Sequence, residues 1–214
     1  MFSNWNGVMK MSEKKVQIME VAEKLFAENG FDGTSVRQIA KEADINVAMI
    51  SYYFGSKEKL LEAMLLLRIS NYMSELQSTI TPEMTPLEKI NCFIKIVITR
   101  VHSNRRMHKI VNFEYTKDSR TLNFDKYIDQ KKENYKIIEE LIKSGQQDGS
   151  FNKNVVPLLV VPTVLGTYLH FYYNKRFFQS ILDLPDQNAI DDYVHSTLIP
   201  HIQNTIKALL TYEK

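Results

Sequence analysis

Residues 46–57, with the sequence NVAMISYYFGSK, combine small, hydroxyl-bearing and aromatic side chains, and Lys57 is the only charged residue among them. If Val47–Phe54 form a short helix, Ile50 and Phe54 point inward. A solvated surface helix more usually carries Glu and Lys on its outer face. Small residues at a helix start let the helix enter the major groove, where polar and aromatic side chains reach base edges. The positions suited to such contacts are Asn46, Val47, Ala48, Ser51 and Tyr52.

Residues suited to contacts with phosphate flank this stretch on both sides. Thr34 is expected to be the N-cap of a preceding helix, with Ser35 and Arg37 beside it. Ser56 and Lys57 open the helix that follows. Free backbone N–H groups and the helix dipole both favour phosphate at such positions. The spacing therefore predicts a phosphate anchor on each side of the base-contacting helix.

Four helices are expected to position these residues. Apolar residues at helical spacing predict a first helix over 13–28, which ends at Asn29-Gly30. A short second helix follows Thr34, and the residues "DIN" at 44–46 separate it from the helix Val47–Phe54. The fourth helix runs from Ser56 to about residue 79. Two short helices separated by three residues, with Ala40 at their crossing, describe a helix-turn-helix.

The segment "KKVQIMEVAEKLFAENGFDGTSVRQIAKEADINVAMISYYFGSKEKLLEAM", Lys14 to Met64, resembles the DNA-binding domain of the tetracycline-repressor (TetR) family of transcriptional regulators. The resemblance implies that Thr34 is the phosphate-contacting cap and that residues 46–52 form the recognition surface. It further implies that Tyr53 and Phe54 are the family's aromatic pair, with Tyr53 among the DNA contacts, and that Lys57 is the anchor opening the fourth helix. The family often has a phosphate-contacting Tyr where this chain has Ser51, and a serine side chain reaches less far. We therefore expect Tyr52 to take over part of this contact with phosphate.

The remaining two-thirds of the chain also read as helices, so the predicted fold class is all-α. "TPEMTP" at 81–86 is a linker, and further helices are expected over 86–104, 107–117, 121–144, 155–182 and 188–211. The predicted organisation is a flexible N-terminal arm (1–12), a three-helix helix-turn-helix DNA-binding domain (13–58) and a larger helical effector-binding and dimerisation domain (59–214).

The last two long helices, 155–182 and 188–211, are the expected homodimer interface. Apolar residues hold one helical phase through the second of these helices and past Pro200, where a kink is expected. The resemblance implies that these helices pair with a second subunit, and two-fold symmetry matches a palindromic operator in double-stranded DNA. The alternative is that both helices simply pack within one chain.

The resemblance also implies a pocket for a small-molecule effector. Aromatic, Met and other apolar residues at helical spacing are suited to line it, although the same pattern is typical of plain core. The candidates are Met64, Leu67, Phe93, Val97, Val101, Phe113, Tyr115, Tyr168 and Phe171.

Composition excludes several other classes of protein. The net charge of +2 requires any DNA contact to come from local placement of charge. The single cysteine, Cys92, leaves no internal disulfide or cysteine metal cluster and favours a cytoplasmic setting.

The apolar run 155–171 contains Pro157 and Pro162 and is too short to span a membrane. Met9 and Met11 are alternative start codons, so residues 1–10 are expected to be either a frayed arm or no part of the native protein.

The five histidines do not share helix faces as metal ligands would, and no nucleophile or phosphate-loop motif occurs. We therefore expect no metal, no cofactor and no enzymatic activity. The predicted function is a sequence-specific DNA-binding regulator, a repressor released from its operator by an effector. The alternatives are a DNA-binding regulator without a ligand, and an activator.

Overall fold

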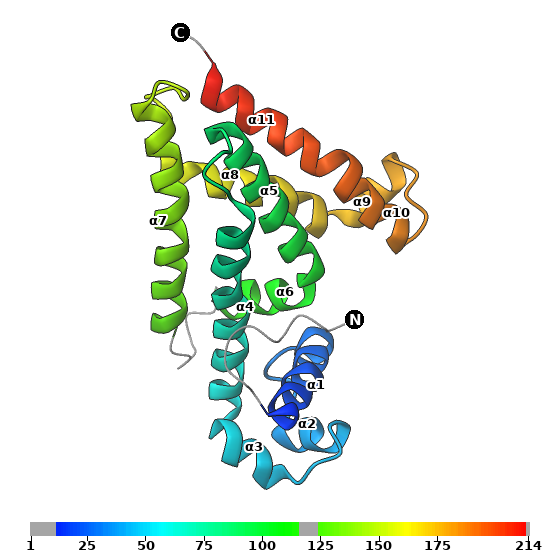
Figure 1. Cartoon of the computed structure of the whole chain (residues 1–214). Helices are drawn as coiled ribbons and strands as arrows, with labels where there is room; N and C mark the ends of the chain where they lie inside the picture. Colours follow the sequence, from blue (N-terminus) through cyan, green and yellow to red (C-terminus); the bar gives the residue numbers. More distant parts are fainter. Residues whose placement is uncertain (1–11, 116–123, 213–214) are drawn as a thin grey trace. The chain divides into compact units, whose positions relative to one another are not determined.

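Helices dominate residues 12–115 and 124–212, the part of the chain that the computed structural model describes (Figure 1). No strand occurs in these two ranges, and the predicted all-α class is confirmed. The predicted N-terminal arm lies outside the described residues except for Ser12, whose side chain accepts a hydrogen bond from the backbone N–H of Lys15. No helix in the described ranges is long and apolar enough to cross a membrane.

The chain divides into two compact units. Their boundaries fall inside helices α4 (Lys57–Thr79) and α7 (Asp125–Gln147) and at the end of α5 (Pro86–Ser103). One unit runs to Tyr72 and resumes over Ser103–Lys131, and the other comprises Met73–His102 and Lys132–Lys214. The first unit therefore takes in more of the chain than the predicted DNA-binding domain, 13–58, which stays a prediction.

Within the first unit, α1 (Glu13–Asn29), α2 (Val36–Glu42) and α3 (Val47–Phe54) gather beside the first turns of α4 (Lys57–Thr79) (Figure 1). Helix α6 (Arg105–Tyr115) packs against α1, and α7 (Asp125–Gln147) begins in this unit. Apolar residues spaced three and four apart on each helix meet in one core. Its members include Ile18, Ala22, Phe26, Ile39, Ile50, Leu61, Met64, Met107 and Ile110.

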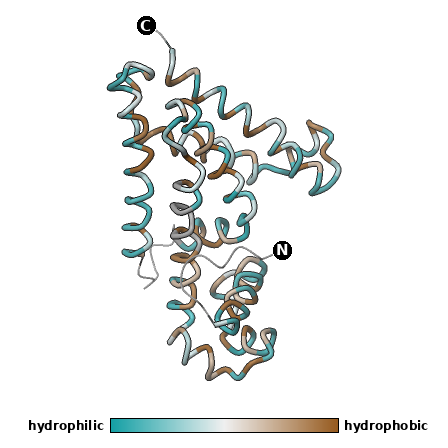
Figure 2. Tube along the Cα trace, in the orientation of Figure 1, coloured by the Kyte–Doolittle hydropathy of each residue, from teal (hydrophilic) through white to brown (hydrophobic). Residues whose placement is uncertain are grey.

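The second unit contains the rest of α4 and α7 together with α5 (Pro86–Ser103) and the C-terminal helices. The latter are α8 (Pro157–Tyr173), α9 (Lys175–Ile181), α10 (Gln187–Tyr193) and α11 (Ile199–Thr211). A π-helical turn, η1 (Val194–Leu198), joins α10 to α11. Along α11 the trace alternates between hydrophilic and hydrophobic residues, as expected of a helix with one buried face (Figure 2).

The prediction of single helices over 155–182 and 188–211 was wrong in detail. Asn174 leaves helical geometry at φ −101° and ψ 23°, and its side chain donates to the carbonyl of His170 at 2.9 Å, which separates α8 from α9. In the second segment the kink expected at Pro200 takes the form of the π-helical turn just before it. Proline has no N–H to continue the α-helical ladder, so a local change of hydrogen-bond pattern is expected there.

Candidate nucleic-acid interface

The turn between α2 and α3 fixes how α3 is presented. Asp44 has a φ of 48°, the left-handed geometry expected for Asp at this position. The backbone N–H of Ile45 donates to the carbonyl of Ala40 at 3.0 Å, and the Gln17 side chain donates to the carbonyl of Ala43 at 2.8 Å. The turn is therefore tied to α1 as well as to α2. Gln17 was not singled out from the sequence, because its partner is a backbone atom distant along the chain.

Helix α3 exposes the residues that the sequence predicted. Asn46 is its N-cap, and the side-chain oxygen accepts from the N–H of Ala48 at 2.8 Å. Ile50 is fully buried and anchors the inner side, whereas Tyr52 is 83% exposed. The outer face carries no charged side chain, and its remaining exposed residues are Val47, Ala48 and Ser51. The arrangement is that of a helix free to enter a groove.

The aromatic residues at the end of α3 join this face to the core. Tyr52 and Tyr53 meet edge to face with ring centroids 5.2 Å apart. Tyr53 and Phe54 are partly buried against the core of the unit, and Lys15 lies over the Tyr53 ring at 5.8 Å. Gly55, with a φ of 84°, ends the helix as predicted. Of these aromatic residues Tyr52 is the exposed one, and DNA contacts of Tyr52 and Tyr53 stay predictions.

The prediction of Thr34 as an N-cap was wrong: Ser35 has that role. The Ser35 hydroxyl accepts from the N–H of Gln38, whose side chain accepts from the N–H of Ser35. Thr34 is buried, and its hydroxyl lies 2.8 Å from the carbonyl of Gly30, to which it donates. Both residues can cap a helix, but Ser is the stronger cap, and Ser35 with Gln38 three residues later fits the capping-box pattern, so the sequence did carry a signal for Ser35. Contact between Thr34 and phosphate stays a prediction, whereas Ser35 and Arg37 are exposed.

Lys57 has a structural role that the sequence did not indicate. Its ammonium donates to the carbonyls of Phe31 and Thr34 at 2.9 and 2.8 Å, and it lies 4.2 Å from the centroid of the Phe31 ring. Ser56 caps α4, accepting from the N–H of Lys59 at 3.2 Å. Lys57 therefore ties the start of α4 to the loop before α2. Because an ammonium has three N–H donors, one remains for the predicted phosphate contact.

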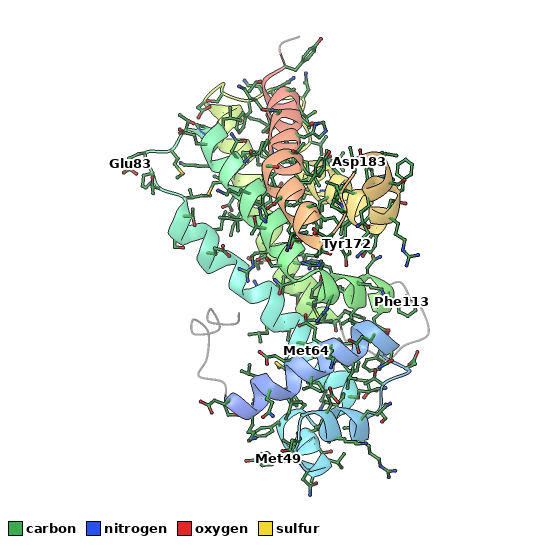
Figure 3. All side chains as sticks on the ribbon, turned by 90° about the vertical axis from the view of Figure 1, so that its right-hand side faces the viewer. Met49, Met64, Glu83, Phe113, Tyr172 and Asp183 are labelled. Atoms are coloured by element: carbon green, nitrogen blue, oxygen red, sulfur yellow. The ribbon has the colours of Figure 1, made fainter. Side chains whose placement is uncertain are left out.

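The predicted pocket residues fall in both units. In the first unit, Met64 is 3% exposed and belongs to the core, and Leu67 packs against it. Phe113 is 54% exposed, and Figure 3 shows it at the edge of α6. The side chain of Tyr115 lies outside the described residues. The buried members in the second unit are Phe93, Val97, Val101, Tyr168 and Phe171. A pocket that uses all of these residues stays a prediction.

A buried polar network crosses the second unit beside those residues. His102, 4% exposed, has Nδ1 2.9 Å from the Tyr168 hydroxyl and Nε2 2.8 Å from a carboxylate oxygen of Asp191. Since an ionised carboxylate only accepts, Nε2 donates to Asp191; in the neutral form of the ring, Nδ1 then accepts from the Tyr168 hydroxyl. The network connects α5, α8 and α10. Among the described residues, no group of three or more His, Cys, Asp or Glu could hold a metal ion.

A groove of about 620 Å³ opens between α8, α9 and the segment from α10 to α11. The residues that line it are Gly166, Thr167, His170, Phe171, Phe178, Tyr193, Thr197, Leu198 and His201, and none is an acid, Lys or Arg. Gly166 is exposed, and a Cβ atom added there would meet no atom within 4 Å. This surface, the α8–α11 face, is uncharged and leaves space beside a helix backbone.

Comparison with known proteins finds matches for both the helix-turn-helix region and the helices that follow it. A family model described as "Bacterial regulatory proteins, tetR family" matches residues 18–64, and one described as "Tetracyclin repressor-like, C-terminal domain" matches residues 86–197. The "Probable HTH-type transcriptional regulator YttP" of Bacillus subtilis is 31% identical over 193 residues, which cover 81% of this chain and 92% of that protein.

Two further proteins are similar over most of their length. The HTH-type transcriptional repressor KstR2 of Mycolicibacterium smegmatis is 24% identical over 144 residues, 67% of this chain and 70% of that protein. The structure of the transcriptional regulator FadR from Bacillus subtilis in complex with stearoyl-CoA superimposes with a TM-score of 0.69 at 18% identity. That alignment covers 91% of this chain and 98% of the FadR chain, and it shows a shared fold.

Proposed function

This chain belongs to the tetR family of bacterial regulatory proteins, and we propose from that premise that it is a dimeric repressor released from a palindromic operator by a small-molecule effector. The observation that carries the proposal is the outer face of α3, which exposes small and polar residues and Tyr52 without any charged side chain. A solvated surface helix more usually carries Glu and Lys on such a face, whereas small, polar and aromatic side chains suit contact with base edges in the major groove.

In the proposed complex the residues of α3 contact base edges. Asn46 and Ser51 provide hydrogen-bonding groups, and Val47 and Ala48 are small enough for thymine methyl groups to approach. Tyr52 supplies an aromatic surface and a hydroxyl. These contacts determine sequence preference, because base edges differ between base pairs whereas phosphates do not.

Phosphate contacts come from the helix starts on either side. Ser35 and Arg37 at the start of α2 are exposed, and Lys57 at the start of α4 keeps one donor for a phosphate. Each such contact adds affinity that is lost as the salt concentration rises. The Lys57 contact has a second effect, since the same ammonium holds the loop before α2 in place.

A second copy of the chain is the proposed occupant of the α8–α11 face. The groove lining contains no acid, Lys or Arg that would repel its own copy, and Gly166 allows close approach of a partner helix. A two-fold dimer presents two copies of α3 to half-sites about 34–36 Å apart, one turn of DNA. Recognition of a palindrome by two half-site contacts thus requires the dimer.

Release by an effector completes the proposed mechanism. The stearoyl-CoA complex of FadR supports it, because a chain of the same fold holds a small molecule. In this chain the buried pocket candidates are apolar or aromatic, which favours an effector with a substantial apolar part. The effector must bind more tightly to the dimer with separated recognition helices than to the DNA-binding form of the dimer. A ligand shifts the equilibrium between two conformations only by the difference in its affinity for them.

Selection from a random pool of DNA duplexes tests this proposal. The purified chain should enrich an inverted repeat whose half-site centres lie about one helical turn, or a whole number of turns, apart. Enrichment of a single unrepeated site would contradict the dimeric mode of binding. Recovery of no preferred sequence at low salt would contradict sequence-specific recognition itself.

A further inference from the structure

Two of the residues lining the groove on the α8–α11 face are histidines from different helices. His170 comes from α8 and His201 from α11, and both side chains are exposed. The His170 ring lies edge-on to Phe178, with centroids 6.1 Å apart. Imidazole is the side chain that ordinarily changes charge between pH 5 and pH 8. The groove therefore places two such groups on a surface with no other charge.

The groove offers these histidines no acid. Apart from them, the only ionisable side chain among its lining residues is Tyr193, which lies in α10. Charged residues do occur on the surrounding elements, but they do not line the groove; these are Lys175 and Arg176 on α9, Asp191 and Asp192 on α10, and Lys207 on α11. His195 of η1 is also outside the groove, and its ring lies edge-on to His102.

We propose that His170 and His201 make dimerisation of this chain sensitive to pH, so that acidification separates the subunits and lowers operator affinity. The inference rests on the proposed function, because it takes a second copy of the chain as the occupant of the groove. A covering subunit removes water from both rings, and the groove lining supplies no acid to pair with them, so burial disfavours the protonated form. Two-fold symmetry brings the same two rings from the partner, so every unfavourable charge occurs twice.

The direction of the effect follows from proton linkage. Separated subunits, with their histidines in water, bind more protons than the dimer does. Lowering the pH through the ordinary titration range of imidazole therefore favours separated subunits, and raising the pH favours the dimer. Because a palindromic operator needs two linked recognition helices, loss of the dimer lowers affinity for the operator without any effector.

Sedimentation equilibrium of the full chain near pH 7.5 and near pH 5.5 tests the inference, since these values bracket the titration of imidazole. We expect the dimer dissociation constant of the wild type to rise by at least about tenfold at the lower pH. The double variant His170→Gln/His201→Gln should change by less than about threefold. The matched control His195→Gln, which alters an exposed histidine outside the groove, should keep the response of the wild type. Far-UV circular dichroism at both pH values checks that each variant is folded.

The outcomes separate this inference from the proposed function. A wild-type dimer of unchanged affinity at both pH values, or a double variant that keeps the full response, overturns the role of the two histidines and leaves the dimer intact. Absence of any dimer near pH 7.5 overturns the dimeric mode of binding as well. If the double variant does not fold, the two single variants are compared, and a full response in both overturns the inference.

Discussion

Tyr52 is the most exposed aromatic residue of α3, with 83% of its surface open to solvent. We expect Tyr52→Ala to weaken operator binding by about 1–3 kcal/mol and to relax preference at the base pairs it contacts. The fold should be unaffected, because little of the side chain is buried. Anisotropy titrations with the operator and its single-base variants measure both effects. Tyr212→Ala, which removes a tyrosine that is 73% exposed at the end of α11, is the control and should bind as the wild type does.

Lys57 and Arg37 are both predicted to contact phosphate, but the structure gives only Lys57 a second task. Arg37→Ala should lower the slope of log affinity against log salt by about one and leave the melting temperature unchanged. Lys57→Ala should lower the slope similarly and also destabilise the fold, because two carbonyls lose their donor. Salt titrations and thermal melts of both variants give the comparison. Equal melting temperatures for the two variants would refute the structural role of Lys57.

At the scale of single residues, the sequence predicted positions with strong local signals. Asn46 and Gly55 bound α3 as expected, since a side chain that caps and a glycine with positive φ act on adjacent backbone. The choice of Thr34 as cap overlooked a local signal, because Ser35 followed three residues later by Gln38 fits the capping-box pattern and Thr34 does not. The contacts of Lys57 with Phe31 and Thr34 were not predictable, because they depend on how distant segments meet.

Among the secondary-structure elements, the sequence predicted nearly every helix. It did not predict the break at Asn174 or the π-helical form of the disturbance before Pro200. Apolar periodicity continues through Asn174 without a break, so no pattern separates α8 from α9. The capping bond from Asn174 to the carbonyl of His170 becomes visible only in the structure. Pro200 did signal a disturbance, but a proline does not specify whether the helix kinks or adopts a π-helical turn.

Close packing at the end of α7 gives a prediction about stability. A Cβ atom added at Gly145 would lie 2.3 Å from the ring of Phe151, which is 4% exposed and has little room to move. Gly145→Ala should therefore destabilise the protein by about 1–3 kcal/mol in denaturant unfolding. In a Phe151→Leu background, which lacks those ring atoms, the same change should cost less. Equal costs in the two backgrounds would mean that the ring is not the obstacle.

At the scale of the whole molecule, Gly166 tests how two chains meet. Gly166→Trp adds a large side chain where the single chain has open space, so the subunit should fold normally. If the α8–α11 face is covered by a second copy, the same side chain blocks its approach and the protein should sediment as a monomer. Gly166→Ala is the matched small substitution and should keep the dimer. A dimeric Gly166→Trp protein would place the interface on another surface.

We propose that this chain binds a specific DNA sequence through α3. The most direct test is fluorescence anisotropy with DNA from upstream of its own gene and a scrambled duplex of equal length, each at two salt concentrations. We expect selective binding to one duplex, with affinity for both falling as salt rises. Failure of the folded protein to bind any duplex, either these or a random pool at low salt, would refute DNA recognition by α3.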